Sequence, residues 1–519
     1  MPRSIWATRE NAEAMKIRDR WRRLTVFFSM MLLLEKRRGR YTRVASILAL
    51  GVATIRSLMH LIQFARTTSP RPLAPYKCVQ INEDGFGDPQ NTYAWSMAWF
   101  KGKLYVGTNR NTQCVERAVI DAYLPELHFY TTFAEQNCDC PPCPQDMDLR
   151  AEIWAYTPET QQWARVFQSP HIPIPSYPGK YVALDIGFRG MAVFQEPDGT
   201  EALYVAGFTA GEFIPELPPP RLLRTTDGLT FEPLPQEPGT VLGDLGRNGY
   251  YGYRAMAVYT PPGAEKPRLY VTAAHGMLGL GVILESADPA KGNNHFRQVS
   301  DADINVFELA VFHGLLYAGG GDDDHGYAVW KTDAIGTPPY KLIPVVTDGA
   351  GRGTAVRCVV SMHAFKGKLY VGSNGVLPPP ITCELIRINP DDSWELVVGN
   401  PRRTSQGFKT PISGLPDNFG NPLIAHFWRM QDHEGVLYLG TNDRSGWHIP
   451  HRLAARISHE FGCDLWMSED GEKWLEVTRD GFGDKSNFGI RTLASTPFGL
   501  FVGTATEFSG TEIWLVTSA

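Results

Sequence analysis

One short motif, Leu-Tyr-Val followed by a small residue, recurs along the chain and limits the folds open to it. Neighbouring copies are separated by 47 residues (Tyr270 to Tyr317) to 99 residues (Tyr105 to Tyr204). A strand repeated at such a period is typical of radially repeated β folds. The sequence therefore predicts an all-β fold, a seven-bladed β-propeller. The copies carry Tyr105, Tyr204, Tyr270, Tyr317, Tyr370, Tyr438 and, in the seventh place, Phe501.

Each repeat extends to four expected strands. The innermost strand, such as Met97–Phe100, is followed by a tight turn, Lys101-Gly102, and by the Leu-Tyr-Val strand. The third strand is Glu152–Trp154 in the first repeat, and the fourth strand opens with an aromatic residue such as Trp163. Glycine favours the two-residue turns that join antiparallel strands. We interpret the aromatic residues as core between blades, because large rings fill wide wedges.

The two chain ends share one repeat. The segment Tyr76–Ile81 precedes D-G-F-G-D-x-x-N, and the same sequence follows Trp474–Val477 near the other end. Tyr76–Ile81 is therefore an outer strand without inner strands of its own, while Ile490–Val516 supplies three strands and lacks the fourth. We predict that the N-terminal strand completes the last blade, which leaves no open sheet edge.

The N-terminal arm differs from the rest of the chain in charge. Residues 1–71 hold fifteen basic and four acidic residues, a net charge of +11, while the remainder has a net charge of −16. Val44–Phe64 is long enough to span a bilayer. Because it contains Arg56 and His60, it also suits an amphipathic helix in the interface or a soluble helical hairpin.

We expect residues 1–66 to be a basic helical membrane-attachment segment, 67–75 a Pro-rich linker and 76–519 the propeller. If Val44–Phe64 spans the membrane, the basic flank places the N-terminus inside and the propeller outside the cytoplasm. We expect a membrane partner and no nucleic acid, since the arm is also rich in Leu, Val, Ile, Phe and Met.

The repeat pattern resembles a bacterial and archaeal group of secreted propeller repeats with no assigned chemistry. The resemblance covers about residues 76–516 and rests on G-x-L-Y-V-G-T, E-I-W and D-G-F-G-D. The turn Ser468–Trp474 and its counterpart Thr225–Phe231 are similar to the Asp-box of sialidase-type propellers, one residue shorter. This resemblance implies a structural turn and no catalytic residue.

Residues that could bind a ligand occupy one equivalent place, two residues before the Met or Leu of the inner strand. We expect them to ring the mouth of the axial channel, on the face that carries the long insertions Asn109–Arg150 and Asn442–Gly462. Arginine and aromatic side chains there would suit an anionic or sugar ligand. The alternative is that the arginines pair with acidic loop residues. The candidates are Arg189, Arg254 and Arg491 with Trp95, Phe307 and Trp428.

Two kinds of acidic loop suggest a hard cation. Asp322, Asp323 and Asp324 follow three glycines, and Asn82, Asp84 and Asp88 belong to the first D-G-F-G-D loop. Carboxylate oxygens suit calcium. The alternatives are a solvated acidic loop for the first and a plain tight turn for the second.

Four cysteines lie in the first long insertion: Cys114, Cys138, Cys140 and Cys143. A long exported loop without a core of its own is typically held by disulfides, and zinc is the alternative. The spacing matches neither a zinc ribbon nor a haem attachment motif.

Our leading hypothesis is a non-enzymatic, membrane-attached propeller that binds a protein, glycan or other surface ligand through the face with the insertions. The second is a hydrolase or lyase that holds an anionic substrate with Arg189, Arg254 and Arg491. The third is a structural subunit of a membrane complex. The sequence shows no Ser-His-Asp spacing, P-loop or dinucleotide fingerprint. His275, His363 and His426 share no inner-strand position that would suit a four-histidine iron site.

Overall fold

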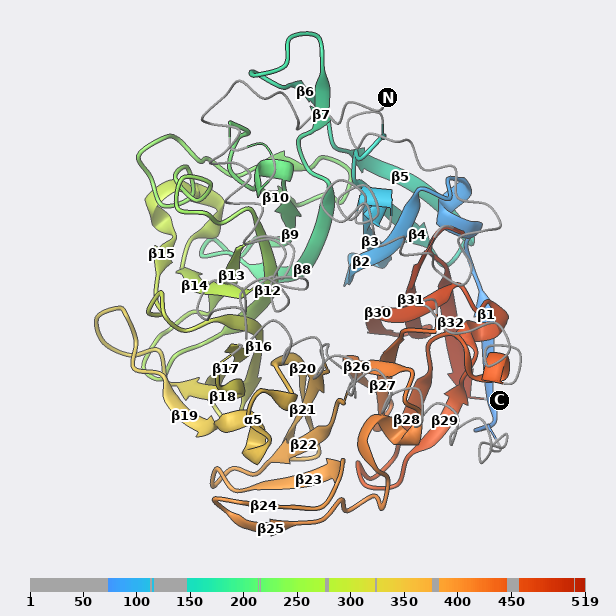
Figure 1. The fold of residues 1–519 in the computed structure, drawn as a ribbon. Coiled ribbons are helices and arrows are strands. Elements are labelled where there is room, and N and C mark those ends of the chain that lie inside the picture. Colours follow the sequence, from blue (N-terminus) through green and yellow to red (C-terminus); the bar gives the residue numbers. More distant parts are fainter. Residues whose placement is uncertain are drawn as a thin grey trace, which may run out of the picture.

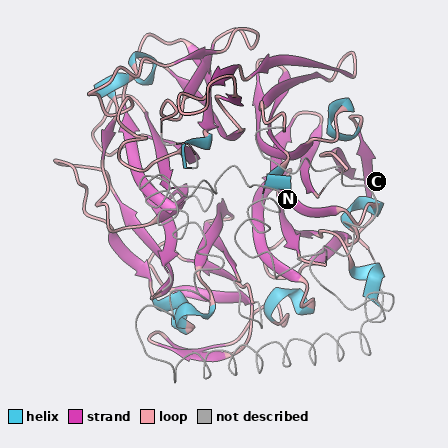
Figure 2. Ribbon diagram, turned by 45° about the horizontal axis from the view of Figure 1, so that its top comes forward, coloured by secondary structure: helices cyan, strands magenta, loops and turns pink. Residues whose placement is uncertain are grey.

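The fold is built from β-strands, as Figure 2 shows. The computed structural model describes residues 73–112, 114–115, 147–212, 214, 216–275, 280–322, 324–375, 382–445, 457–507 and 509–518. Among these residues, 28 strands join in one continuous sheet. Helices such as η1 (Asp84–Gly87) and α5 (Asp348–Gly351) are single turns between strands. The prediction of an all-β fold is confirmed.

The strands form consecutive antiparallel groups of four in chain order. The first group is β2 (Asn91–Phe100), β3 (Lys103–Arg110), β4 (Glu152–Thr157) and β5 (Gln162–Gln168). The next two are β8 (Gly187–Gln195), β9 (Glu201–Phe208), β10 (Leu222–Thr225), β11 (Glu232–Pro233), and β12 (Gly252–Tyr259), β13 (Arg268–His275), β14 (Leu280–Ser286), β15 (Arg297–Gln298). Then follow β16 (Val306–Phe312), β17 (Leu315–Asp322), β18 (Gly326–Thr332), β19 (Ile343–Val346), and β20 (Cys358–Phe365), β21 (Lys368–Asn374), β22 (Leu385–Ile388), β23 (Trp394–Val398). The last full set along the chain is β26 (Ile424–His433), β27 (Val436–Asp443), β28 (Leu465–Ser468) and β29 (Leu475–Thr478).

The remaining group joins the two ends of the described chain. It consists of β30 (Asn487–Thr496), β31 (Gly499–Thr506), β32 (Ile513–Ser518) and β1 (Tyr76–Gln80). The pairing of β1 with β32 is antiparallel and places Cys78 opposite Val516 and Gln80 opposite Trp514. The predicted pairing of the N-terminal strand with the last strand is therefore confirmed.

The groups follow one another around a ring (Figure 1). The first strand of each group contacts the first strand of the next, through β2, β8, β12, β16, β20, β26 and β30, and β30 contacts β2. Backbone pairing also crosses between groups, for example from Asn109 to Gly187 and from Ala505 to Tyr93. The core lies between neighbouring groups: Tyr105 of β3 packs in one cluster with Phe188 of β8 and Phe231, which precedes β11.

The turns between third and fourth strands are held by side-chain hydrogen bonds. Asp470 Oδ1 accepts from the backbone N–H groups of Glu472 and Lys473 at 2.8 Å each, and Ser468 Oγ accepts from Gly471 N. Asp227 and Thr225 make the same contacts in the second group. These bonds favour the ionised carboxylate and lower the pKa of Asp470. The structural interpretation of the Asp-box is confirmed.

Replacing Asp470 by Ala should lower the free energy of unfolding by about 1–2 kcal/mol, because two turn N–H groups lose their acceptor. Asp391→Ala is a suitable comparison, since Asp391 is also an exposed turn carboxylate but accepts only from Ser393. Urea unfolding monitored by tryptophan fluorescence measures both changes. An unchanged unfolding midpoint for Asp470→Ala would contradict the role we give this side chain.

The D-G-F-G loops have a structural role: the phenylalanine of each loop stacks on a tryptophan of a neighbouring strand. In η1, Phe86 stacks on Trp154 with ring centroids 4.8 Å apart, and in η9 (Gly481–Gly483), Phe482 stacks on Trp514 at the same distance. A third copy, η7 (Asp417–Gly420), places Phe419 on Trp466 at 4.0 Å. Each loop has left-handed backbone at this phenylalanine. Sequence reasoning missed the third copy because Asn418 replaces the first glycine.

The predicted membrane partner is corrected by the structure. Among the described residues, no helix reaches the length and apolarity needed to cross a bilayer. The helices at 289–291, 293–295 and 458–460, for example, have three residues each, whereas a span needs about 20. Residues 1–66, on which the prediction rested, lie outside the described part of the chain.

Candidate functional site: a ring of bulged inner strands

All seven inner strands are interrupted by a β-bulge at the predicted ligand position. The pairing with the second strand shifts register at Trp95, Arg189, Phe307, Trp428 and Arg491, and in β12 at Arg254 with Ala255. A bulge leaves one residue out of the ladder and changes the direction of its side chain. The six predicted residues thus occupy one structural position. Val360 of β20, which the sequence analysis did not single out, completes this bulge ring.

The three arginines of the bulge ring are buried. Arg491 is 1% exposed, Arg254 3% and Arg189 7%. Arg254 donates from Nε to the carbonyl oxygen of Phe307 at 2.9 Å, and its Nη2 has no partner among the described residues. None of the three side-chain nitrogens of Arg491 has a hydrogen-bond partner in the described part of the protein. The alternative that Arg254 and Arg491 are held in salt bridges is therefore wrong for the described residues.

The three guanidinium groups influence one another, although β30, which carries Arg491, neighbours β2 and β26, whereas β8 and β12 neighbour each other. Burial, and next the charge of Arg491, lower the pKa of Arg189 to about 9. Burial lowers the pKa of Arg491 well below its usual value, and the charge of Arg254 is the largest contributor after burial. Arg254 belongs to the third group and Arg491 to the group shared by the chain ends. Because each charge affects the pKa of another, we infer that these side chains point toward the centre of the ring.

One described carboxylate takes part in this cluster. Glu308 Oε2 lies 3.2 Å from Nη1 of Arg429, on β16 and β26 respectively. Both groups act on the charge states of Arg254 and Arg491. Four guanidinium groups thus face one described carboxylate. The centre has an excess of positive charge that an anion could neutralise.

Aromatic rings pack against the arginines in a repeated arrangement. The Cζ of Arg189 lies 5.0 Å from the Trp95 ring, and that of Arg491 lies 5.2 Å from the Trp428 ring. Each tryptophan also covers a glycine of the neighbouring strand. A Cβ on Gly187 would come within 2.1 Å of Trp95, and one on Gly489 within 2.2 Å of Trp428. The two glycines are needed because the rings occupy the space of a side chain.

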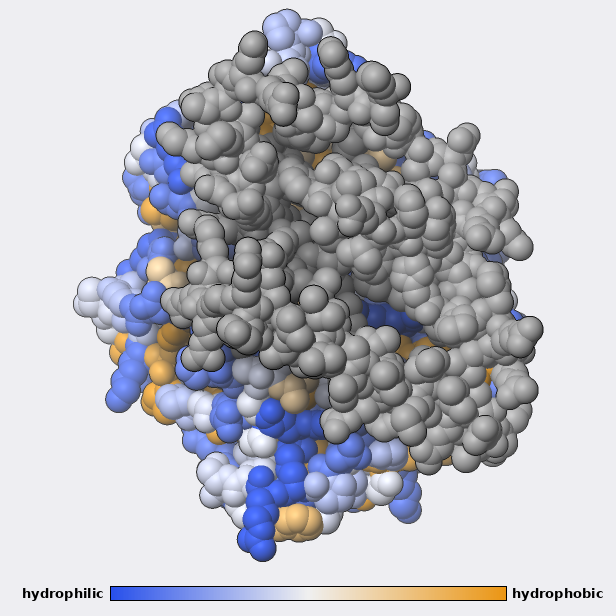
Figure 3. All heavy atoms as spheres, viewed as in Figure 1, coloured by the Kyte–Doolittle hydropathy of each residue, from blue (hydrophilic) through white to orange (hydrophobic). Residues whose placement is uncertain are grey.

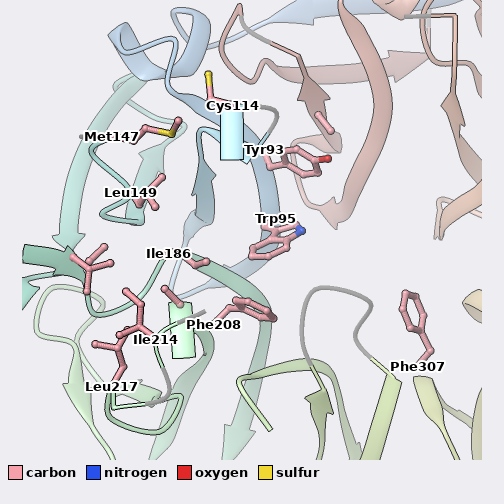
Figure 4. Close-up of a cluster of buried hydrophobic side chains, with 14 of the residues drawn as sticks. Tyr93, Trp95, Cys114, Met147, Leu149, Ile186, Phe208, Ile214, Leu217 and Phe307 are labelled. Carbon is pink, nitrogen blue, oxygen red and sulfur yellow. The ribbon is translucent and has the colours of Figure 1, made fainter. Parts of the chain in front are cut away.

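The first long insertion reaches the bulge ring. Its described ends contribute Cys114, Met147 and Leu149 to the cluster that contains Trp95, Phe307 and Trp428. Figure 4 shows Trp95 and Phe307 entering this region from β2 and β16. In Figure 3, hydrophilic residues are visible near the centre of the same face. The expected placement of this insertion beside the candidate site agrees with these contacts.

The acidic loops serve as turns in the described structure. Asp322 Oδ1 accepts from the backbone N–H groups of Asp324 and His325, and Asp84 Oδ1 accepts from Gln80 Nε2. Asp88 pairs with Arg110 at 2.7 Å. Within the described residues no group of three or more His, Cys, Asp or Glu side chains could hold a metal ion. Asp323 lies outside them, so calcium at Asp322–Asp324 stays a prediction.

The cysteines fall into two sets. Cys78, Cys358, Cys383 and Cys463 are free thiols, and burial raises the pKa of Cys78 to about 11. Cys114 is in a disulfide bond. Cys138, Cys140 and Cys143 lie outside the described residues. The pairing of the insertion cysteines, and the extracytoplasmic location that it would suit, stay predictions.

Peptide mapping of the unreduced protein should therefore recover Cys114 in a cross-linked peptide with Cys138, Cys140 or Cys143. The four free cysteines provide the internal control, because they should be alkylated without reduction once the protein is unfolded. Recovery of Cys114 as a free thiol from freshly isolated protein would contradict the assignment and would favour zinc in the insertion.

No protein-family model matches the sequence, and no curated protein matches it. Among solved structures, the chain is similar to the polysaccharide lyase Uly1, with 10% identity over 88% of this chain and 95% of that chain and a TM-score of 0.43. It is also similar to an ancestral GH74 enzyme, with 11% identity over 84% of this chain and 49% of that one and a TM-score of 0.46. Both neighbours are described as enzymes, which gives no support to our leading hypothesis of a non-enzymatic binding module.

Proposed function

We propose that the protein is a seven-bladed propeller in which the two chain ends share one blade. The support is the cyclic contact of the seven inner strands and the antiparallel pairing of β1 with β32. The carbonyl of Asn91 also accepts from Thr511 N at 2.7 Å, which ties the shared group to the first one. A ring closed in this way holds its inner strands rigidly, and such scaffolds commonly carry function at loops and strand ends.

We propose further that this propeller is an enzyme, a hydrolase or lyase, that acts on an anionic substrate at the bulge ring. The observation that carries the proposal is the set of buried guanidinium groups, of which Arg491 has no hydrogen-bond partner among the described residues. A buried cation without a counterion is costly. A substrate anion would offset this cost, and the planar guanidinium binds carboxylates through two parallel hydrogen bonds.

The aromatic members of the ring narrow the substrate class. Trp95 and Trp428 present rings beside Arg189 and Arg491. Aromatic rings bury a large apolar area and have little side-chain entropy to lose. The face of a sugar ring that presents its C–H groups offers a matching apolar surface. An acidic sugar unit would place its carboxylate at the arginines and its ring against a tryptophan. We therefore propose an acidic polysaccharide or oligosaccharide as the substrate.

The test compares uronic-acid polysaccharides of several backbones with their methyl-esterified forms. Binding is measured by isothermal titration, and cleavage by size-exclusion chromatography of the products. We expect at least one acidic chain to bind and to be shortened, and its ester, which lacks the charge, to do neither. Equal action on the acid and its ester, or no binding of any acidic chain, would overturn the proposal.

A further inference from the structure

The inner strands carry a second set of equivalent residues, which lie two residues before the bulge. At these positions the inner strand pairs both with its own second strand and with the second strand of the preceding group. His426, for example, pairs with Asn442 and with Asn374. We call these the junction residues: Tyr93, Gly187, Gly252, His426 and Gly489.

Residue type at the junction follows residue type at the bulge. A glycine stands two positions before each arginine, in Gly187-Phe188-Arg189, Gly252-Tyr253-Arg254 and Gly489-Ile490-Arg491. Tyr93 and His426 precede the two tryptophans instead. The junction therefore brings two groups that can exchange a proton to the same level of the ring as the arginines. No single stretch of sequence shows this, because the two residues are 333 positions apart.

Tyr93 and His426 surround one indole together with Arg491. The ring of Trp428 lies 5.8 Å from the His426 ring and 6.3 Å from the Tyr93 ring, both in edge contact. The Cζ of Arg491 lies 5.2 Å from the same indole. A substrate group bound at Arg491 would thus lie beside an indole that also contacts a histidine and a tyrosine.

His426 offers an unprotonated nitrogen in this site. Its side chain is partly accessible, and its Nδ1 has no hydrogen-bond partner among the described residues. The charged groups that face it are Arg444, Arg254 and Arg491; burial first, and then these three arginines, hold the pKa of His426 well below its usual value. The imidazole is therefore neutral near pH 7, which is the form that a general base requires.

The described site offers little to a mechanism based on paired carboxylates. Glycoside hydrolysis ordinarily uses two Asp or Glu side chains placed on either side of the scissile bond. In the described part of the ring, Glu308 is the carboxylate that acts on the arginines, and it is paired with Arg429. Elimination needs a base, an acid and a cation at the carboxylate instead.

We propose that the reaction is a β-elimination at an acidic sugar, with His426 as the base and Tyr93 as the acid. The proposal rests on the proposed function. His426 takes the proton from the carbon next to the carboxylate that Arg254 and Arg491 hold. The electron pair of that C–H bond forms a C=C bond with the adjacent carbon, whose bond to the glycosidic oxygen breaks. The Tyr93 hydroxyl gives its proton to the departing oxygen, so no water is consumed.

The experiment uses the full chain, the acidic polysaccharide that it cleaves and the variants His426→Gln and Tyr93→Phe. His363→Gln is the matched control: His363 lies on the neighbouring inner strand β20, but its Nε2 pairs with Asp432 at 2.8 Å, away from the bulge. We expect kcat to fall by roughly 100-fold or more in both site variants, as for loss of a general acid or base. Substrate affinity by titration and the melting temperature should stay near wild type, and His363→Gln should remain active.

Two readouts separate this mechanism from a structural role. The products should carry an unsaturated uronate end, visible by ultraviolet absorbance and as a mass lower by one water than a hydrolysis product. The profile of kcat/KM against pH should fall on the acid side only well below the usual pKa of histidine, because His426 must be neutral and its pKa is lowered, and this limb should be absent in His426→Gln. Saturated products, or full turnover by His426→Gln, would overturn the elimination and leave the proposed function standing. A wild-type protein that neither binds nor cleaves any acidic polysaccharide would overturn both the elimination mechanism and the proposed function.

Discussion

Replacing Arg491 by Met should stabilise the protein and abolish binding of its anionic ligand. Arg491 is 1% exposed, and its guanidinium has no hydrogen-bond partner among the described residues. Replacing buried charged groups by packed apolar side chains is often neutral or stabilising, by up to about 4 kcal/mol, and Arg491 has no described counterion to leave behind. The same change removes two charge-assisted hydrogen bonds to the ligand, so affinity should fall roughly 100-fold or more. Thermal unfolding without ligand and titration with the acidic substrate measure the two effects.

The matched control is Arg352→Met, which removes a guanidinium that does have counterions. Arg352 lies 2.6 Å from Asp417 and 3.3 Å from Glu384, and both carboxylates are buried. Its loss leaves the Asp417 carboxylate without its arginine, while Glu384 keeps Arg402 at 2.7 Å, and should cost about 3–5 kcal/mol of stability. Opposite signs for the two variants would distinguish a ligand site from a structural ion pair. If Arg491→Met unfolds the protein as Arg352→Met does, the arginine has a structural partner and our site is wrong.

The second large effect concerns the closing strand. A protein that begins at Pro89 should aggregate or fail to fold, because it lacks β1 and the loop after it. The edge of β32 would lose its partner over five residues, and an unpaired edge strand favours association between chains. Trp163 would lose the acceptor at the carbonyl of Ile81, 2.8 Å from its Nε1, and Trp154 would lose the stacked ring of Phe86.

A protein that begins at Leu73 is the appropriate control, since it keeps β1 and the whole loop. Size-exclusion chromatography and thermal unfolding compare the two. We expect the longer protein to be folded and the shorter one to be recovered as aggregate or as unfolded chain. A folded shorter protein with an unchanged melting temperature would show that the ring does not need its N-terminal strand.

Much of the architecture follows from local sequence. The Leu-Tyr-Val motif predicts the second strands, and the aromatic that opens the last strand of a group lies at or before β5, β15 and β23. The position of the bulge ring could also be predicted, because Arg189, Arg254 and Arg491 each stand two residues before the Met or Leu of the inner strand. Such patterns are readable because strand period, turn residues and repeat length act over neighbouring residues.

The tertiary structure alone decided what these residues do. Sequence spacing places Arg254 and Arg491 on equivalent strands, but only the closed ring brings their side chains into one region, where neither forms a salt bridge with a described carboxylate. It likewise aligns Tyr93 with His426, which belong to different repeats and have different neighbours in the chain. Local sequence sets the strands and the bulges because these depend on neighbouring residues. Burial and repulsion between charges depend on distances across the ring, which exist only once the first and last strands have paired.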